Sequence, residues 1–143
     1  MTLDAALPDY ADPALHAQGL WIGGQWLPGR GIKVINPSTG LPLAEVVDAS
    51  IADAMAAVDA AEAAAPGWRA TPHRQRSEIL RRLFTRMTEE AEALARLISL
   101  ENGKALSDAR GEVAYASEFF RWYAEEATRI GGEFRRTPSG SHN

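Results

Sequence analysis

The sequence predicts an α+β chain in which short antiparallel strands precede a run of helices. Between about residues 20 and 47, β-favouring residues alternate with turn signals, as they do in β-hairpins. From residue 50 onward, apolar residues recur every three or four positions, which is the period of an amphipathic helix. The chain has 143 residues, enough for one domain, and its 45% hydrophobic and 24% charged residues suit a folded protein that buries a core.

The strands are predicted from the turns between them. Gly23 and Gly24 separate Leu-Trp-Ile from Gln-Trp-Leu, and because both glycines tolerate a positive φ they indicate a two-residue hairpin turn. Residues 32–35 and 43–47 form the next two predicted strands. Between these strands lies the turn Asn-Pro-Ser-Thr-Gly at 36–40, in which the proline fixes φ and the glycine permits the left-handed region.

The first predicted helix covers residues 51–65. Ser50 is its expected N-cap, and Asp53, three residues later, completes a capping box. We expect Pro66 and Gly67 to end this helix, because proline lacks the N–H that a helix interior needs.

The second predicted helix covers residues 72–87 and follows an N-cap signal. Thr71 is the expected N-cap, with Pro72 at the first helical position, where the missing N–H has no cost. We expect Thr88 to cap a third helix over residues 89–101.

Glycines follow the last two predicted helices. Gly103 is the expected C-cap of the third helix. The fourth helix, 105–130, is predicted from apolar spacings of three and four throughout, and Gly131 and Gly132 form its expected C-cap pair.

The two ends of the chain lack a hydrophobic period. We expect residues 1–18 and 133–143 to be a flexible arm and a flexible tail around an ordered segment, 19–132. No apolar run approaches the roughly 18 residues of a membrane span, and the arm has no lysine or arginine to begin a secretory signal. The net charge is -4, which disfavours nucleic acid and anionic membranes as partners. We therefore expect a cytoplasmic protein that binds neither.

Residues with catalytic or metal-binding chemistry are sparse. The absence of cysteine excludes disulfides, thiolate metal sites and a cysteine nucleophile within this chain. His16, His73 and His142 are far apart, so no pair has metal-ligand spacing. The Asn-Gly-Lys at 102–104 lacks the upstream glycine and the following hydroxyl of a phosphate loop. The residues alone predict no self-sufficient active site.

The charged residues of the helices have two interpretations. Six arginines crowd around the second helix and could follow a nucleic-acid backbone, but neighbouring glutamates favour a solvated face with ion pairs. Glu118, Glu125 and Glu126 could supply an acid–base pair, but Arg121 and Arg129 at helical spacing favour ion pairs there too. The six arginines are Arg69, Arg74, Arg76, Arg81, Arg82 and Arg86.

Four motifs in a fixed order resemble a known family. They are Trp-Ile-Gly-Gly-Gln-Trp at 21–26, Ile-Asn-Pro-Ser-Thr-Gly at 35–40, Glu-Asn-Gly-Lys at 101–104 and Trp-Tyr-Ala-Glu-Glu-Ala at 122–127. Together they look like the N-terminal part of the aldehyde dehydrogenase superfamily, over about residues 19–135. The last motif is most similar to succinate-semialdehyde dehydrogenases.

The resemblance implies a part of a larger enzyme. Residues 19–132 would be the N-terminal segment of the cofactor-binding domain in the α/β aldehyde dehydrogenase fold, without its Rossmann sheet. The family oxidises aldehydes to carboxylic acids with NAD or NADP, using a cysteine thiolate that attacks the carbonyl. This sequence has no cysteine, so we expect the chain alone to be inactive and to bind neither cofactor.

The resemblance also implies roles for a few positions. Members of the family often bind a structural monovalent cation partly through main-chain oxygens, which correspond here to Ile35 and Glu101. The remaining ligand would come from sequence that this chain lacks, so we do not expect a competent site in it. Phe119, Phe120 and Trp122 correspond to a helix near the family's substrate tunnel, although core packing is the interpretation that we favour for each.

Two hypotheses of different classes follow. In the first, the chain is a truncated or split aldehyde dehydrogenase polypeptide. In the second, it is an interaction module that docks on a full-length homologue or on a complementary aldehyde dehydrogenase segment, or that associates with itself, because exposed apolar faces remain where the sheet is missing.

Overall fold

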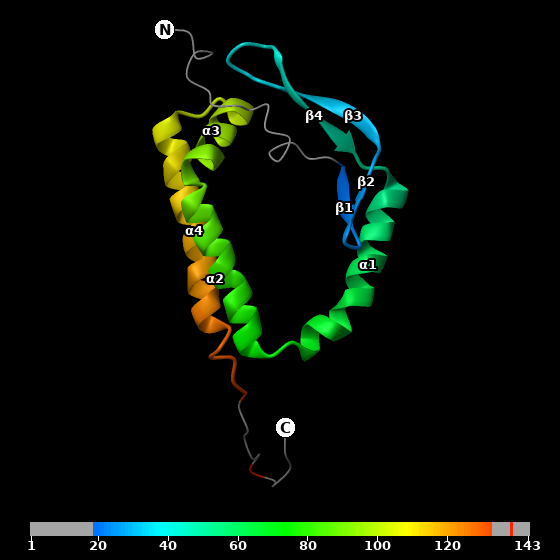
Figure 1. Cartoon of the computed structure of the whole chain (residues 1–143), viewed down its shortest axis with the longest axis vertical. Helices are drawn as coiled ribbons and strands as arrows, with labels where there is room; N and C mark the ends of the chain where they lie inside the picture. Colours follow the sequence, from blue (N-terminus) through cyan, green and yellow to red (C-terminus); the bar gives the residue numbers. More distant parts are fainter. Residues whose placement is uncertain (1–18, 133–137, 139–143) are drawn as a thin grey trace. The chain divides into compact units, whose positions relative to one another are not determined.

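The computed structural model describes residues 19–132 and residue 138. The arm and nearly all of the tail expected from the sequence lie outside the described residues. Within these ranges no helix combines the length and the apolar character that a membrane span requires. The elements, labelled in Figure 1, are β1 (Leu20–Ile22), β2 (Gln25–Leu27), β3 (Arg30–Ile35), β4 (Pro42–Asp48), α1 (Ile51–Ala70), α2 (His73–Glu89), α3 (Ala91–Asn102) and α4 (Leu106–Glu126).

The described residues divide into two compact units. The first contains the hairpins and α1, as far as Ala70, together with Arg96–Leu106. The second contains Thr71–Ala95 and the described residues from Ser107 onward. The predicted α+β class, two hairpins followed by four helices, is confirmed.

The first hairpin pairs β1 with β2 in antiparallel register, with Trp21 opposite Trp26. Gly23 and Gly24 have φ values of 59° and 82°, so both occupy the left-handed region that a tight hairpin turn of the predicted kind requires. The two indole rings lie 5.0 Å apart between centroids and are tilted by 57°. The predicted strand–turn–strand unit is confirmed.

The second hairpin pairs β3 with β4, again antiparallel. Asn36 builds the turn between them: its carbonyl oxygen accepts hydrogen bonds from the backbone of Thr39 (3.3 Å) and Gly40 (2.8 Å). Its side-chain Oδ1 also accepts one from the backbone N–H of Ser38 (2.9 Å). Gly40 has a φ of 71°, as predicted for the last residue of this turn.

Helix α1 begins with the predicted capping box. The carboxylate of Asp53 accepts hydrogen bonds from the backbone N–H (2.8 Å) and hydroxyl (2.7 Å) of Ser50, and the Ser50 hydroxyl oxygen accepts one from the backbone N–H of Asp53 (3.2 Å). These bonds satisfy N–H groups that have no partner inside the helix. They hold the pKa of Asp53 below its ordinary value.

The predicted end of α1 at residue 65 is wrong. The helix contains Pro66 and continues to Ala70. A proline removes one intrahelical hydrogen bond but does not prevent the following residues from remaining helical. The helix ends just before Thr71, which precedes Pro72 and is therefore biased away from helical dihedrals.

The predicted starts of the second and third helices are also corrected. Pro72 is itself the N-cap of α2, with a ψ of 144° and no side-chain cap, so Thr71 is not the capping residue. Thr88 belongs to α2 and its hydroxyl donates to the carbonyl of Phe84 (2.9 Å). Because that hydroxyl bonds back into α2, it does not cap α3, which begins at Ala91.

The two later helix ends differ from each other. Gly103 caps α3 as predicted, with a φ of 74° and its N–H donating to the carbonyl of Ser99 (2.9 Å). Helix α4 ends at Glu126, four residues before the predicted end. The Thr128 hydroxyl donates to the carbonyl of Glu125 (2.9 Å), so this terminal carbonyl is satisfied there, and Gly131 and Gly132 do not adopt positive φ.

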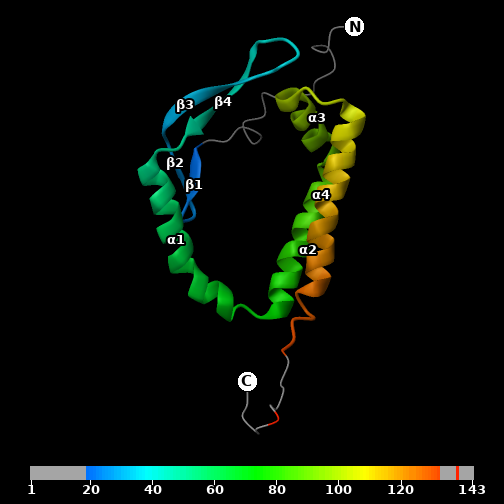
Figure 2. The same cartoon turned by 180° about the vertical axis from the view of Figure 1, so that it is seen from behind.

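The helices of the second unit pack through small buried residues and also make contacts between charged and aromatic side chains on their surface. Helices α2 and α4 run side by side in both Figure 1 and Figure 2. The guanidinium of Arg121 lies 5.7 Å from the centre of the Phe84 ring, and Arg110 donates two hydrogen bonds of 2.9 Å to Glu92. The buried side chains here are small, which lets helix backbones approach closely: Ser77, Ala95, Ala109, Val113, Ser117 and Ala124.

The capping box predicts a pH-dependent stability. The pKa of Asp53 is lower in the folded chain than its ordinary value of 3.8. Ionised Asp53 therefore stabilises the fold fully at pH values above 3.8, and this stabilisation is lost as the pH falls through the folded pKa. We expect the Asp53→Asn variant to lose less stability than the native chain between pH 7 and about pH 3, as measured by urea unfolding followed by circular dichroism. Asp59→Asn on the same helix is the matched control, and equal pH dependence of the two variants would contradict the prediction.

Candidate functional site

The turn at 36–40 lies against the C-terminal end of α3. A Cβ atom added to Gly103 would lie 3.0 Å from Cγ and 3.7 Å from Cβ of Pro37. Two of the four motifs, far apart in sequence, are therefore in contact within the first unit. We call this contact, formed by residues 36–40 and 101–104, the turn junction.

Hydrogen bonds fix the α3 side of the turn junction. The Ser99 hydroxyl donates to the carbonyl of Lys104 (2.6 Å), while the Ser99 carbonyl accepts from the N–H of Gly103 (2.9 Å). Ser99 thus bonds to two of the residues that follow it at the end of α3. A glycine is required at 103 for two reasons, its positive φ and the close approach of the proline ring.

The two residues expected to bind a cation lie beside the turn junction. Ile35 is the last residue of β3 and pairs in register with Pro42, which has no N–H to donate to it. Glu101 lies in the last turn of α3, where carbonyl groups lack intrahelical partners. Carbonyl oxygens are ligands for hard cations, but two oxygens are an incomplete ligand set. The described residues contain no cluster of three histidine, cysteine, aspartate or glutamate side chains that could hold a metal.

An exposed aromatic face lies on α4. It consists of Tyr115, Phe119, Trp122 and Tyr123, whose exposed fractions range from 47% for Phe119 to 69% for Tyr115. The Tyr115 and Phe119 rings meet edge to face at 5.0 Å. Together with Glu118 the four aromatic residues line a shallow hollow of about 310 Å³. Phe119 and Trp122 therefore do not pack in a core of the described chain, contrary to the interpretation favoured from sequence, whereas Phe120 is half-buried.

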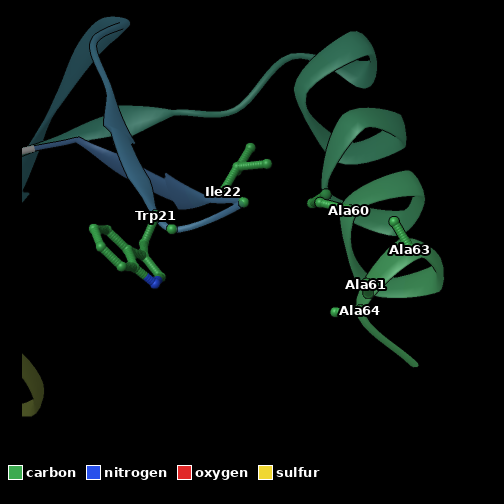
Figure 3. A pocket seen from close by; sticks show the side chains of 9 residues that line it. Trp21, Ile22, Ala60, Ala61, Ala63 and Ala64 are labelled. Atoms are coloured by element: carbon green, nitrogen blue, oxygen red, sulfur yellow. The ribbon is translucent and has the colours of Figure 1, made fainter. Parts of the chain in front are cut away.

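A second hollow lies between the first hairpin and α1. Figure 3 shows the Ile22 side chain directed toward the alanine positions of the helix, with Trp21 beside it. The hollow has a volume of about 620 Å³, and none of its lining side chains can act as an acid, a base or a nucleophile. Its lining is Trp21, Ile22, Gly23, Gly24, Ala57, Ala60, Ala61, Ala63 and Ala64.

The charged helix residues form the predicted ion pairs. Arg121 pairs with Glu118 at 2.6 Å, and Arg129 pairs with Glu126 at 2.6 Å. Of the six arginines around α2, Arg86 pairs with Glu90, and Arg76 donates to the carbonyl of Thr71 (3.0 Å). The three ion pairs are on exposed surface and contribute little to stability.

The histidines supply no site in the described chain. His73 is exposed in the first turn of α2, as its sequence position predicts. His16 and His142 lie outside the described residues.

A nicotinamide cofactor does not fit the described residues. Such cofactors bind at the carboxyl ends of parallel strands, beside a glycine-rich loop and a helix N-terminus. Both sheets of the described chain are two-stranded and antiparallel. We assign no part of a dinucleotide site to them.

The turn junction brings together two of the four motifs that resemble aldehyde dehydrogenases. Residues 22–143 match the aldehyde dehydrogenase family. The chain therefore belongs to this family, and it corresponds to an N-terminal part of it.

Semialdehyde dehydrogenases are among the proteins that this chain is similar to. The glutarate-semialdehyde dehydrogenase of Pseudomonas putida is 45% identical over 125 residues, which cover 85% of this chain and 26% of that protein. The NADP-dependent succinate-semialdehyde dehydrogenase of Escherichia coli K12 is 43% identical with the same coverage. The crystal structure of succinate-semialdehyde dehydrogenase from Burkholderia pseudomallei superposes with a TM-score of 0.84 at 36% identity, covering 92% of this chain and 28% of that one. The chain thus spans about a quarter of the length of these relatives.

Sequence reasoning missed the contact between Pro37 and Gly103. Each residue was identified through its local role, the proline in a turn and the glycine as a helix cap. Nothing in the local pattern indicates that the two roles meet. The resemblance was the available signal, because it links both motifs to one scaffold.

The turn junction predicts opposite effects for two glycine substitutions. Gly103→Ala places a Cβ in the left-handed region and against Pro37, so we expect a loss of about 1 kcal/mol or more in unfolding free energy. Gly111→Ala is the matched control, because Gly111 is helical within α4 and its added Cβ meets nothing within 4 Å. We expect that control to gain about 0.5–1 kcal/mol. Changes of the same sign in urea unfolding would contradict this account.

Proposed function

We propose that this chain is the N-terminal scaffold segment of an NAD(P)-dependent aldehyde dehydrogenase that oxidises a short semialdehyde, such as succinate semialdehyde, to the carboxylic acid. The observation that carries the proposal is the turn junction, formed by two of the motifs of the resemblance. Relatives named for succinate or glutarate semialdehyde, at 43% and 45% identity, support the substrate class.

We further propose that the chain has no dehydrogenase activity alone. The family reaction begins with the attack of a cysteine thiolate on the aldehyde carbon, and this chain has no cysteine. The described residues also do not fit the cofactor that accepts the hydride. The nucleophile and the dinucleotide site would both come from a complementary aldehyde dehydrogenase segment.

The Ile35 and Glu101 carbonyls would contribute to a structural monovalent cation site in the assembled enzyme. This proposal is supported by the positions of the two residues, since Ile35 directly precedes the turn at 36–40 and Glu101 belongs to the α3 side of the turn junction. The cation's remaining ligands would come from the complementary segment.

A second candidate function is that of an interaction module, and the exposed aromatic face of α4 favours it. Such a module would dock on a full-length homologue or associate with itself. Both proposals require a surface that binds a partner. The interaction module differs because the complex that it forms need not catalyse a reaction.

An activity assay separates the two functions. We expect the purified 143-residue chain to reduce neither NAD nor NADP above the blank with succinate semialdehyde. A single-chain fusion of residues 1–143 to the remaining three quarters or so of the E. coli relative should reduce one of them. The control is the same fusion with the catalytic cysteine of its E. coli part changed to serine. A folded but inactive fusion would contradict the proposed enzyme function and leave the interaction module.

The aromatic face predicts a substrate effect in that fusion. If Phe119 borders the aldehyde channel, Phe119→Ala should raise KM for succinate semialdehyde by about tenfold, the scale of one lost apolar side-chain contact. Leu83→Ala on α2 is the control, since Leu83 is exposed to a similar extent (40% against 47%). Equal KM changes for the two variants would show that Phe119 does not contact the substrate.

A further inference from the structure

Helix α1 has no buried residue although it is 20 residues long. Most helices in proteins are stabilised by packing an apolar face against another element. The first hairpin lies against α1, and it faces the alanine positions that line the hollow of Figure 3. Of the larger apolar side chains of the helix, Trp68 lies on the alanine side, and the other three lie elsewhere.

Ile51, Met55 and Val58 form a stripe on the other side of α1. Their spacings of four and three residues place them on one face of a helix. At 3.6 residues per turn, this face lies about half a turn around the axis from Ala60 and Ala64. The three side chains are exposed by 86%, 57% and 59%. We call them the α1 stripe.

Helix α1 is therefore apolar on two opposite sides. A helix of this kind is typical of the interior of a larger protein, where both sides are covered. The hairpin covers one side. The α1 stripe lacks a cover among the described residues of its unit.

We propose that the α1 stripe is the docking surface for the complementary segment, the part of an aldehyde dehydrogenase polypeptide that this chain does not represent. The proposal rests on the proposed function. Its first support is length, because about three quarters of each relative lies outside the matched region.

Charge and area argue against a second copy as the occupant. The next position on the stripe is Glu62, so two antiparallel copies would bring this carboxylate against the apolar Ile51 of the other chain. Three side chains also present far less surface than the roughly 800 Å² per partner of a stable dimer. The complementary segment should instead present an apolar surface with a basic residue opposite Glu62.

The absence of cysteine allows a direct test. Met55→Cys introduces a single thiol into residues 1–143, and Ala56→Cys places one on the neighbouring flank of α1 as a matched control. Each variant is prepared in the 143-residue chain and in the single-chain fusion. The rate of iodoacetamide labelling at the introduced thiol is followed by mass spectrometry of the α1 peptide, which separates it from cysteines of the E. coli part.

We expect labelling of Met55→Cys to be at least tenfold slower in the fusion than in the 143-residue chain, and labelling of Ala56→Cys to change by less than threefold. If the fusion is active and Met55→Cys is labelled at the same rate in it as in the 143-residue chain, the docking surface is overturned and the proposed function still stands. Protection that already occurs in the 143-residue chain, and grows with its concentration, would overturn the occupant in favour of a second copy. An inactive fusion with unprotected Met55→Cys would remove both proposals.

Discussion

The scarcity of buried apolar side chains governs this structure. Among the described residues, the buried hydrophobic positions are three alanines, one valine and one leucine, and no large side chain is fully buried. The large apolar residues lie mainly on exposed faces, including the α1 stripe and the aromatic face of α4. Burial of large apolar residues is the main favourable term in the free energy of folding. Because these faces are exposed in the described chain, they do not add to its stability.

Local interactions define the elements in spite of this small core. The turn at Gly23 and Gly24, the capping box of α1 and the glycine cap of α3 are each made by residues a few positions apart. Such interactions set where an element begins or ends, but a two-stranded hairpin or a single helix is marginal in water by itself. The turn junction adds a contact between distant segments, and its tight fit at Gly103 makes that residue sensitive to change.

The sequence predicted the elements well where the signal is local and failed where two local signals compete. Pro66 satisfied the usual rule for a helix end, yet α1 continues past it, because the stronger break is at Thr71 and Pro72. Thr88 has the chemistry of an N-cap, but its hydroxyl bonds back to Phe84 instead. At the candidate site, the roles of Pro37 and Gly103 were predictable one by one. Their contact was not predictable, because the sequence patterns of helices and turns concern only residues that are close together in the chain.

Small and large apolar residues have different places in this chain. Alanines and serines occupy most of the buried positions of α2, α3 and α4, beside Leu100 and Val113, and alanines line the hairpin side of α1. The exposed large side chains include tryptophan, phenylalanine, tyrosine, isoleucine and methionine, on helices and on strands. Interface cores are enriched in the aromatic and methionine residues of this second group. The small residues therefore occupy the positions where the elements of each unit pack, and we propose that the exposed large residues are the ones that a partner covers. In the proposed enzyme, that partner brings the cysteine, the cofactor site and the missing cover together.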